Sequence, residues 1–287
     1  MKKERVSVYI DGGNTYRRLK SIGIPQKPCR FDYSAFIEYL LGDRTLTSKK
    51  YYVGIVRNTD NSEKAEQMVR SQQKFLNSLR TEGFDIEAGK IMYDGGDIRE
   101  KGVDVKFSLD IAIGAVENLY DTAIVISSDT DLVPAIKYAR NIKKKNIEYI
   151  GFGLTPSFGM IRESSVSRVL SDIDLLQFQS KTLKFEENLA ELILRNKKRV
   201  TRRLFDDKNL KTGDLLNLQI SETGKSFAKA RIVHLIEKSL GNVVESDYDG
   251  HEKYESKEEM LTKFKKYYGN KVDLNTLVKI IKFDIKK

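Results

Sequence analysis

Short apolar runs alternate with amphipathic stretches along the N-terminal part of the chain. The apolar runs are typical of buried strands, and in the stretches between them apolar residues recur every three or four positions, as in helices. Strands are expected at 6–10, 50–57, 86–92, 123–127 and 147–152, and helices at 31–41, 62–82, 103–118, 132–143 and 161–170. This alternation predicts an α/β fold in which a parallel sheet of about five strands is sandwiched by helices.

The pattern changes after Gln177, where short strands separated by turn residues replace the alternation. Strands are expected at 183–185, 200–205, 215–220, 226–235 and 277–285, and helices at 187–194 and 258–268. The turn Glu222-Thr223-Gly224 is typical of a β-hairpin. The sequence therefore predicts two domains, residues 1–178 and residues 182–287, of which the second is a small β-barrel with helices.

Composition excludes several classes of protein. No apolar run among the 287 residues is long enough to cross a bilayer, and the N-terminus leads into the first strand without a signal-peptide core. We therefore expect a cytoplasmic protein that does not act at a membrane. Cys29 is the single cysteine, and His234 and His251 are the only histidines, so any metal is expected to bind through oxygen. The oligomeric state is left open, a homo-oligomer included.

The chain is basic, with a formal net charge of +10. The excess lies mostly after Ser180. Lysine and arginine neutralise phosphates and release counterions, which is the electrostatic basis of nucleic-acid binding. The simpler interpretation is that lysine-rich faces keep the protein in solution.

Four aspartates stand where a strand or a charged turn gives way to a helix. Asp11 follows the strand at 6–10, Asp104 begins a helix, and Asp129 and Asp131 follow the strand at 123–127. Ligands bind at the carboxyl ends of the strands of an open parallel sheet, so these acids converge if the two strands are neighbours. Carboxylates of this kind bind Mg²⁺ or Mn²⁺, which activates water for attack on a phosphodiester.

Each acid also has a structural explanation when it is taken alone. Asp131 is suited to capping the helix that begins at Leu132, and Asp104 to interacting with a helix dipole. Asp110 is left out of the predicted site because it lies about 240° around the helix from Asp104. Asn14 is expected to hydrogen-bond a phosphate or orient a water molecule, and the same is expected of Ser127 and Ser128.

Three motifs resemble those of NYN domains of the LabA-like branch of PIN-like nucleases: Val8-Tyr9-Ile10-Asp11-Gly12-Gly13-Asn14, Lys101-Gly102-Val103-Asp104-Val105 and Ser127-Ser128-Asp129-Thr130-Asp131-Leu132-Val133-Pro134. The resemblance covers roughly residues 5–174. It implies a metal-dependent ribonuclease whose metal-binding and catalytic acids are Asp11, Asp104, Asp129 and Asp131. The chain departs from the family pattern at Gly13, where an acid or serine is usual, and at Ser128, where glycine is usual.

A dense run of cationic side chains, Lys197-Lys198-Arg199-Val200-Thr201-Arg202-Arg203, marks the start of the second domain's strand at 200–205. Such a patch is able to hold several phosphates, and RNA binding is predicted through Lys197, Lys198, Arg199, Thr201 and Arg203. The alternative is a solvated strand edge that lysines protect from aggregation. Tyr248, Tyr254, Tyr267 and Tyr268 are suited to stacking on bases, or equally to a core.

The second domain resembles ASCH domains, which are small PUA-like barrels linked to RNA. The resemblance rests on Leu183-Lys184-Phe185, the run 197–201, Leu210-Lys211-Thr212-Gly213-Asp214 and Gly250-His251-Glu252-Lys253-Tyr254. It implies RNA binding. Some ASCH proteins are amidohydrolases acting on N(4)-acetylcytidine with a lysine, a threonine and a glutamate, and Lys198, Thr201 and Glu252 occupy the matching places.

The leading hypothesis from the sequence is a ribonuclease that uses Mg²⁺ or Mn²⁺ and has RNA as its partner. A non-cleaving RNA-binding adaptor is the second hypothesis, and an amidohydrolase centred on the barrel is the third. A haloacid-dehalogenase-like phosphatase fits less well, because its Asp-x-Asp motif follows the first strand. A Toprim-type site requires glutamate where Asp11 stands.

Overall fold

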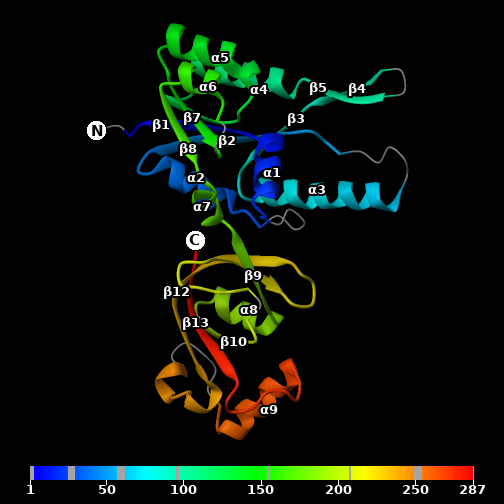
Figure 1. Cartoon of the computed structure of the whole chain (residues 1–287), viewed down its shortest axis with the longest axis vertical. Coiled ribbons are helices and arrows are strands. Elements are labelled where there is room, and N and C mark those ends of the chain that lie inside the picture. Colours follow the sequence, from blue (N-terminus) through cyan, green and yellow to red (C-terminus); the bar gives the residue numbers. More distant parts are fainter. Residues whose placement is uncertain are drawn as a thin grey trace. The chain divides into compact units, whose positions relative to one another are not determined.

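The chain forms two compact units, Met1–Phe178 and Gln179–Lys287, and each is described by itself. The computed structural model describes residues 3–24, 30–56, 62–94, 97–153, 156–206, 208–248 and 254–286, and only the backbone of 90–101. Figure 1 shows the elements of both units. No helix in these ranges combines the length and the apolar character that crossing a bilayer requires.

The first unit is built on a six-stranded parallel sheet with the order β3-β2-β1-β6-β7-β8. Its strands are β1 (Arg5–Asp11), β2 (Thr45–Val53), β3 (Asp85–Ala88), β6 (Thr122–Ile126), β7 (Asn146–Phe152) and β8 (Val166–Leu170). A separate antiparallel hairpin consists of β4 (Lys90–Asp94) and β5 (Asp97–Lys101). The sheet order reverses at β1, which lies between β2 and β6.

Helices cover both faces of this sheet (Figure 1), with α4, α5 and α6 on one face and α1, α2 and α3 on the other. The helices are α1 (Gly12–Ser21), α2 (Tyr33–Leu41), α3 (Glu63–Thr81), α4 (Val103–Val116), α5 (Val133–Lys137), α6 (Phe158–Glu163) and α7 (Asp172–Leu176). A π-helical turn, Tyr138–Ile142, continues α5. The central strands β1 and β6 are largely apolar because residues on both of their faces are buried.

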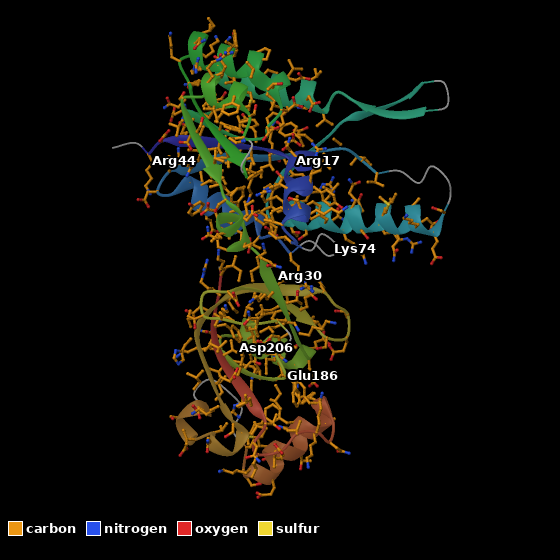
Figure 2. All side chains as sticks on the ribbon, viewed as in Figure 1. Arg17, Arg30, Arg44, Lys74, Glu186 and Asp206 are labelled. Atoms are coloured by element: carbon orange, nitrogen blue, oxygen red, sulfur yellow. The ribbon has the colours of Figure 1, made fainter. Side chains whose placement is uncertain are left out.

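Aromatic side chains fill much of the core beneath α4. Tyr9 of β1, Tyr52 of β2 and Phe107 of α4 lie in one buried cluster, with the rings of Tyr52 and Phe107 centred 4.1 Å apart. Tyr51 points to the opposite face of the sheet and packs edge to face on Tyr33 of α2. At the end of α2, Arg44, which Figure 2 labels, forms an ion pair with Glu148 on β7.

The predicted α/β fold is confirmed, and several elements differ from the expectation. The parallel sheet has six strands rather than five. The stretch 161–170, predicted as a helix, is the end of α6 followed by β8, which pairs in parallel with β7. Helix α1 was not predicted, because its first residues, Gly12-Gly13-Asn14, are typical of a turn.

The second unit is a curled, half-barrel mixed sheet with the order β10-β13-β12-β11-β9. Its strands are β9 (Ser180–Phe185), β10 (Val200–Leu204), β11 (Leu215–Ile220), β12 (Ser226–Ser239) and β13 (Leu277–Ile285), and its helices are α8 (Glu187–Leu194) and α9 (Lys257–Tyr268). Strands β9 and β11 are parallel and the other pairs are antiparallel. The predicted small barrel is therefore an incompletely closed one.

One arginine connects the two edge strands of this curled sheet. Arg203 of β10 donates a hydrogen bond from Nη2 to the carbonyl oxygen of Lys184 on β9, at 2.7 Å. Its guanidinium lies over the ring of Phe185, 4.8 Å from the ring centre. The contact therefore joins β9 and β10, which are not hydrogen-bonded neighbours in the sheet.

Candidate functional site

The carboxyl ends of β1 and β6 lie side by side in the first unit. The two strands are parallel neighbours whose register pairs Ile10 with Ile126. Asp11 is the last residue of β1, and Ser127 and Ser128 follow β6 directly. The adjacency on which the sequence argument depended is therefore present, at the position where the strand order reverses.

Asp11 is held by two hydrogen bonds. Its Oδ1 accepts from the backbone N–H of Asn14 at 2.8 Å, so the side chain caps α1. Its Oδ2 accepts from the hydroxyl of Ser127 at 2.7 Å. Both carboxylate oxygens therefore have a fixed direction before any ligand arrives.

Ser127 also connects Asp11 to the second pair of acids. The side chain is buried, and its hydroxyl oxygen accepts a hydrogen bond from the backbone N–H of Asp129 at 3.1 Å. Asp129 in turn accepts from the backbone N–H of Asp131, at 2.9 Å, and caps the short helical turn Thr130–Leu132. One continuous series of hydrogen bonds thus runs from β1 to the start of α5.

Asp104, the second residue of α4, faces the same region. Its pKa is raised, first by partial burial and then by the negative charges of Asp129, Asp11 and Asp131. Burial and the three neighbouring carboxylates all shift the pKa of this carboxyl group in the same direction. The structure therefore brings the four predicted acids into one electrostatic neighbourhood.

The four carboxylates supply hard oxygen ligands and negative charge, which is the chemistry that Mg²⁺ and Mn²⁺ require. Within the ranges that the structure describes, however, no three acidic, histidine or cysteine side chains are gathered tightly enough to hold one metal ion. The oxygen atoms and the negative charge of the four acids are therefore suited to a divalent cation. Their side chains lie farther apart than the ligands of a single coordinated metal ion.

The other predicted residues of this region lie in different positions. Asn14 contacts Asp11 through its backbone, and the hydroxyl of Ser128 lies 3.2 Å from that of Tyr149 on β7. Asp110 is turned to Tyr52, whose hydroxyl donates to it at 2.7 Å, and to Lys106 at 2.9 Å. Sequence reasoning treated Ser127 as a contact for phosphate and missed its hydrogen bonds to two of the acids.

The second unit contains a cavity of about 700 Å³ between its edge strands and the helices α8 and α9. Cationic and aromatic side chains dominate its lining: Lys184, Lys198, Arg202, Arg203, Lys263, Phe185, Tyr254, Phe264, Tyr267 and Tyr268. Glu186, which Figure 2 labels, also lines the cavity and accepts a hydrogen bond from Tyr267 at 3.0 Å. The cavity is therefore basic and has several aromatic rings.

Three polar residues of this lining are buried, namely Lys198, Thr201 and Arg202. Arg202 donates to the carbonyl oxygen of Asp247 at 3.3 Å, and its guanidinium lies 5.7 Å from the ring centre of Tyr254. Thr201, Arg202 and Arg203 all belong to β10, which is an edge strand of the curled sheet. Polar groups held in such a place are costly to bury and mark a candidate binding site.

The cationic run predicted to bind RNA divides between the cavity and other surfaces. Lys198, Thr201 and Arg203 line the cavity, whereas Lys197 is exposed and Arg199 forms a hydrogen bond with Asn196. Glu252 lies outside the described residues. Sequence reasoning missed the contributions of three lining residues, Lys184, Arg202 and Lys263, because only the curled sheet and α9 bring them together.

The parallel sheet with acids at its carboxyl ends is the arrangement of PIN-like domains. Residues 5–173, more than half of the chain, match the NYN domain family, and the chain belongs to that family. NYN domains are classed with the PIN-like ribonucleases, which typically use divalent metals and act on nucleic acid. No curated protein matches the chain significantly.

Several solved structures resemble parts of the chain. A protein of unknown function from Vibrio parahaemolyticus is 21% identical, with 59% of this chain and 96% of that chain covered and a TM-score of 0.46. The C-terminal part matches an ASCH domain from Lactobacillus crispatus, at 17% identity, with 40% and 86% of the two chains covered and a TM-score of 0.31. A protein from Enterococcus faecalis is 18% identical, with 34% and 69% covered and a TM-score of 0.30.

Proposed function

We propose that the N-terminal domain, residues 1–178, is a metal-dependent ribonuclease. The observation that supports this most directly is the mutual influence of four carboxylates from β1, α4 and the turn after β6. Membership of the NYN family makes nucleic acid the expected substrate. The proposed metal-binding and catalytic acids are Asp11, Asp104, Asp129 and Asp131.

Asp11 and Asp129 are the two acids that Ser127 connects. Ser127 binds both of them, through its hydroxyl hydrogen to Asp11 and through its oxygen to the N–H of Asp129. Asp104 enters from the first turn of α4. We assign to Asp11 and Asp129 the role of orienting the cation. Asp104 and Asp131 would complete its coordination when it binds.

A bound Mg²⁺ or Mn²⁺ would supply the positive charge that stabilises the phosphodiester transition state and would activate the attacking water. The chain's own contribution is to orient the acids through the hydrogen bonds of Asn14, Ser127 and Asp131. Among the described side chains, the charges that act on Asp104 are all negative, and a bound metal ion would relieve their repulsion. RNA is then positioned by contacts outside the acid cluster.

The test is cleavage of a mixed RNA pool by the purified full chain in the presence of Mg²⁺ or Mn²⁺. Cleavage should be abolished by chelator and reduced at least about 100-fold in Asp11→Asn and Asp129→Asn. Asp85→Asn is the matched control, since Asp85 is an exposed acid on β3 away from the cluster.

Two outcomes would count against the proposal. Cleavage that survives in both Asp11→Asn and Asp129→Asn would exclude the acid cluster as the site. Tight, salt-sensitive RNA binding without cleavage under either metal would instead favour the non-cleaving adaptor.

For the C-terminal domain, residues 182–287, we propose RNA binding in the basic cavity. Lys184, Arg203 and Lys263 supply charge for phosphates, and Tyr254 and Tyr267 supply rings for a base. Lys263 lies 5.1 Å from the ring centre of Tyr254, so charge and aromatic surface occur together. This combination suits a nucleotide better than either feature alone.

The binding test compares two lysines of the same helix. Lys263 lines the cavity, whereas Lys265, two residues later on α9, does not. Lys263→Ala should weaken RNA binding and lower the slope of affinity against salt by about one unit, and Lys265→Ala should not. Equal effects of the two substitutions would show that the lysines act only through net charge.

The amidohydrolase hypothesis is favoured by one observation, the presence of Lys198 and Thr201 together in the cavity. In that mechanism Thr201 attacks or orients water and Lys198 accepts the proton. Release of acetate from N(4)-acetylcytidine by the wild-type chain, and its loss in Lys198→Ala, would support it. Acetate release that is unchanged in Lys198→Ala would exclude this pair.

A further inference from the structure

An exposed phenylalanine lies next to the proposed acid cluster. Phe158 is the first residue of α6 and is 81% exposed. A Cβ at Gly159, its neighbour in the chain, would lie 3.2 Å from Cγ2 of Thr130. Thr130 stands between Asp129 and Asp131 in the sequence. The start of α6 therefore packs on the turn that carries two of the acids.

Hydrogen bonds hold this end of α6 in place. The hydroxyl of Tyr149 on β7 accepts the backbone N–H of Ser157 at 3.2 Å and lies 3.2 Å from the hydroxyl of Ser128. The side chain of Ser157 also caps α6. Because Ser128 directly precedes Asp129, these bonds connect the backbone beside Phe158 to the acid turn at a second point.

A cationic side chain lies beside the acid at the end of β1. Arg17 of α1, which Figure 2 labels, is exposed and forms no ion pair with the residues that the structure describes. A Cβ at Gly13 would lie 3.9 Å from Nη1 of Arg17 and 3.5 Å from Oδ1 of Asp11. Gly13 and Arg17 are one helical turn apart, and glycine supplies no carboxylate to pair with the arginine there. The guanidinium is therefore close to Asp11 and able to bind a phosphate.

These two side chains belong to opposite sides of the acid cluster. Helix α1 follows β1 and covers one face of the sheet, whereas α6 follows β7 and covers the other face (Figure 1). Strands β1, β6 and β7 are consecutive in the sheet, and the acids follow β1 and β6 at its carboxyl edge. A nucleotide chain that crosses this edge would therefore meet Arg17, the acids and Phe158 in turn.

We propose that the substrate of the acid cluster is single-stranded RNA, in which Arg17 binds a backbone phosphate and Phe158 stacks on an unpaired base. The inference rests on the ribonuclease function proposed for the first unit. Arginine forms paired hydrogen bonds with phosphate, and an aromatic ring stacks on any base because every base has a π-face. In a duplex the bases are already paired and stacked, so Phe158 would find no free base to contact. Both residues position the substrate, and the acids remain the reacting groups.

The first experiment measures base stacking without cleavage, in the full chain carrying Asp129→Asn. Single-stranded RNAs of about 12 nucleotides carry the fluorescent base 2-aminopurine at successive positions, and stacking quenches its fluorescence. Quenching at one or more positions should be lost on Phe158→Ala and kept on Phe158→Tyr. The control is Tyr39→Ala, an exposed aromatic residue of α2, which leads to the amino end of β2 at the opposite edge of the sheet. It should leave the quenching unchanged.

The second experiment measures the salt dependence of binding to the same RNAs. Arg17→Ala should lower the slope of affinity against salt by about 0.7, which is the value of one phosphate contact on a single strand. The matched control is Arg80→Ala, since Arg80 is an exposed arginine of α3 just before the amino end of β3. In cleavage by chains with an intact Asp129, Arg17→Ala and Phe158→Ala should each raise KM about 10-fold with kcat nearly unchanged. The wild type should cleave single-stranded RNA at least about 10-fold faster than a duplex of the same sequence.

Three results would each overturn the proposal. They are quenching in Phe158→Ala that equals the wild-type pattern at every position, a salt slope of Arg17→Ala equal to that of Arg80→Ala, and cleavage of duplex RNA as fast as of single strands. Circular dichroism establishes that each variant is folded, which is expected because both side chains are exposed.

Failure of the ribonuclease proposal would give a different result. If the wild type cleaves no RNA while quenching depends on Phe158 and the salt slope depends on Arg17, the first unit binds single-stranded RNA without cutting it. Cleavage that is insensitive to both substitutions would instead support the nuclease and exclude these two residues as its RNA contacts.

Discussion

The hydroxyl of Ser127 lies 2.7 Å from the Oδ2 of Asp11, and the two residues are 116 positions apart in the sequence. The serine is buried at the end of β6 and also accepts the N–H of Asp129. Its position fixes the relative orientation of two acids that come from different strands. Ser127 is thus the residue through which the two halves of the acid cluster are connected.

Ser127→Ala should therefore impair the site without removing any acid. Asp11 would keep only its bond from Asn14, and the N–H of Asp129 would lose its partner. Residues that orient metal ligands typically contribute 10–100-fold to metal affinity or activity, so a loss of about that size is expected. Isothermal titration with Mn²⁺ and single-turnover cleavage measure it.

The control for this substitution is Ser71→Ala, since the hydroxyl of Ser71 bonds only the carbonyl of Gln67 within α3. Manganese affinity and cleavage that are the same in Ser127→Ala as in the wild type would refute the connecting role of Ser127.

Asp104→Asn should make the fold more stable at neutral pH. Because the folded state raises the pKa of Asp104, protonation of this group favours folding. That contribution is present at low pH and is lost as the pH rises through the folded pKa, which leaves a repulsive carboxylate at pH 7. The melting temperature of the variant should exceed that of the wild type on the order of 1 °C at pH 7, and the difference should shrink toward pH 4.

Metal ions provide the complementary measurement. Millimolar Mg²⁺ should raise the melting temperature of the wild type, because a ligand that binds only the folded state stabilises it. The shift should be smaller in Asp104→Asn. An equal shift in both proteins would place the bound ion away from Asp104.

Gly12→Ala should destabilise the first unit by about 2 kcal/mol or more. A Cβ at position 12 would lie 2.5 Å from Cε1 of Tyr51 and 2.6 Å from the backbone oxygen of Tyr52, and the backbone cannot give way easily. Gly13→Ala is the matched control, since its nearest neighbour would be Asp11 Oδ1 at 3.5 Å. The urea midpoint of Gly12→Ala should therefore be lower than that of Gly13→Ala. Equal midpoints would contradict the close approach of position 12 to Tyr51 and Tyr52.

Asp110→Asn should lower stability by about 2 kcal/mol at pH 7. Burial works to raise the pKa of Asp110, but hydrogen bonds from Lys106, Tyr52 and Lys50 hold it below its ordinary value. A carboxyl group with a lowered pKa stabilises the fold at neutral pH, and this contribution is lost as the pH falls through the folded pKa. Urea unfolding should therefore separate variant and wild type at pH 7 and much less at pH 3.

Asp85→Asn serves as the control for that comparison, because Asp85 is exposed on the edge strand β3. A gap between Asp110→Asn and wild type that stays constant from pH 7 to pH 3 would show that packing, rather than charge, gives Asp110 its effect.

Much of the first unit could be predicted because buried parallel strands and amphipathic helices differ clearly in their apolar spacing. The exceptions have local causes. Ile161, Val166 and Leu170 are compatible with a helix, but the stretch after Ser165 forms hydrogen bonds with β7, and sequence spacing does not reveal such a partner. Gly12 and Gly13 suggested a turn, whereas the cap from Asp11 allows a helix to begin there.

The acids themselves were recognisable because each ends a strand or starts a helix. What the sequence could not supply was the order of the strands, and therefore the contact between Ser127 and Asp11. In the second unit the burial of Arg202 was equally hidden, since it depends on the curl that turns an edge strand toward α9.

The pairing of β1 with β6 determines when the acid cluster is able to assemble during biosynthesis. A chain still emerging from the ribosome presents Asp11 long before Thr122–Ile126 has been made, and until then the aspartate has no neighbouring strand on that side. Closing so long a loop is slow compared with forming local helices. The nascent protein therefore carries its first acid as an isolated residue, and any RNA nearby, including its own message, meets no assembled cluster until synthesis has passed Asp131.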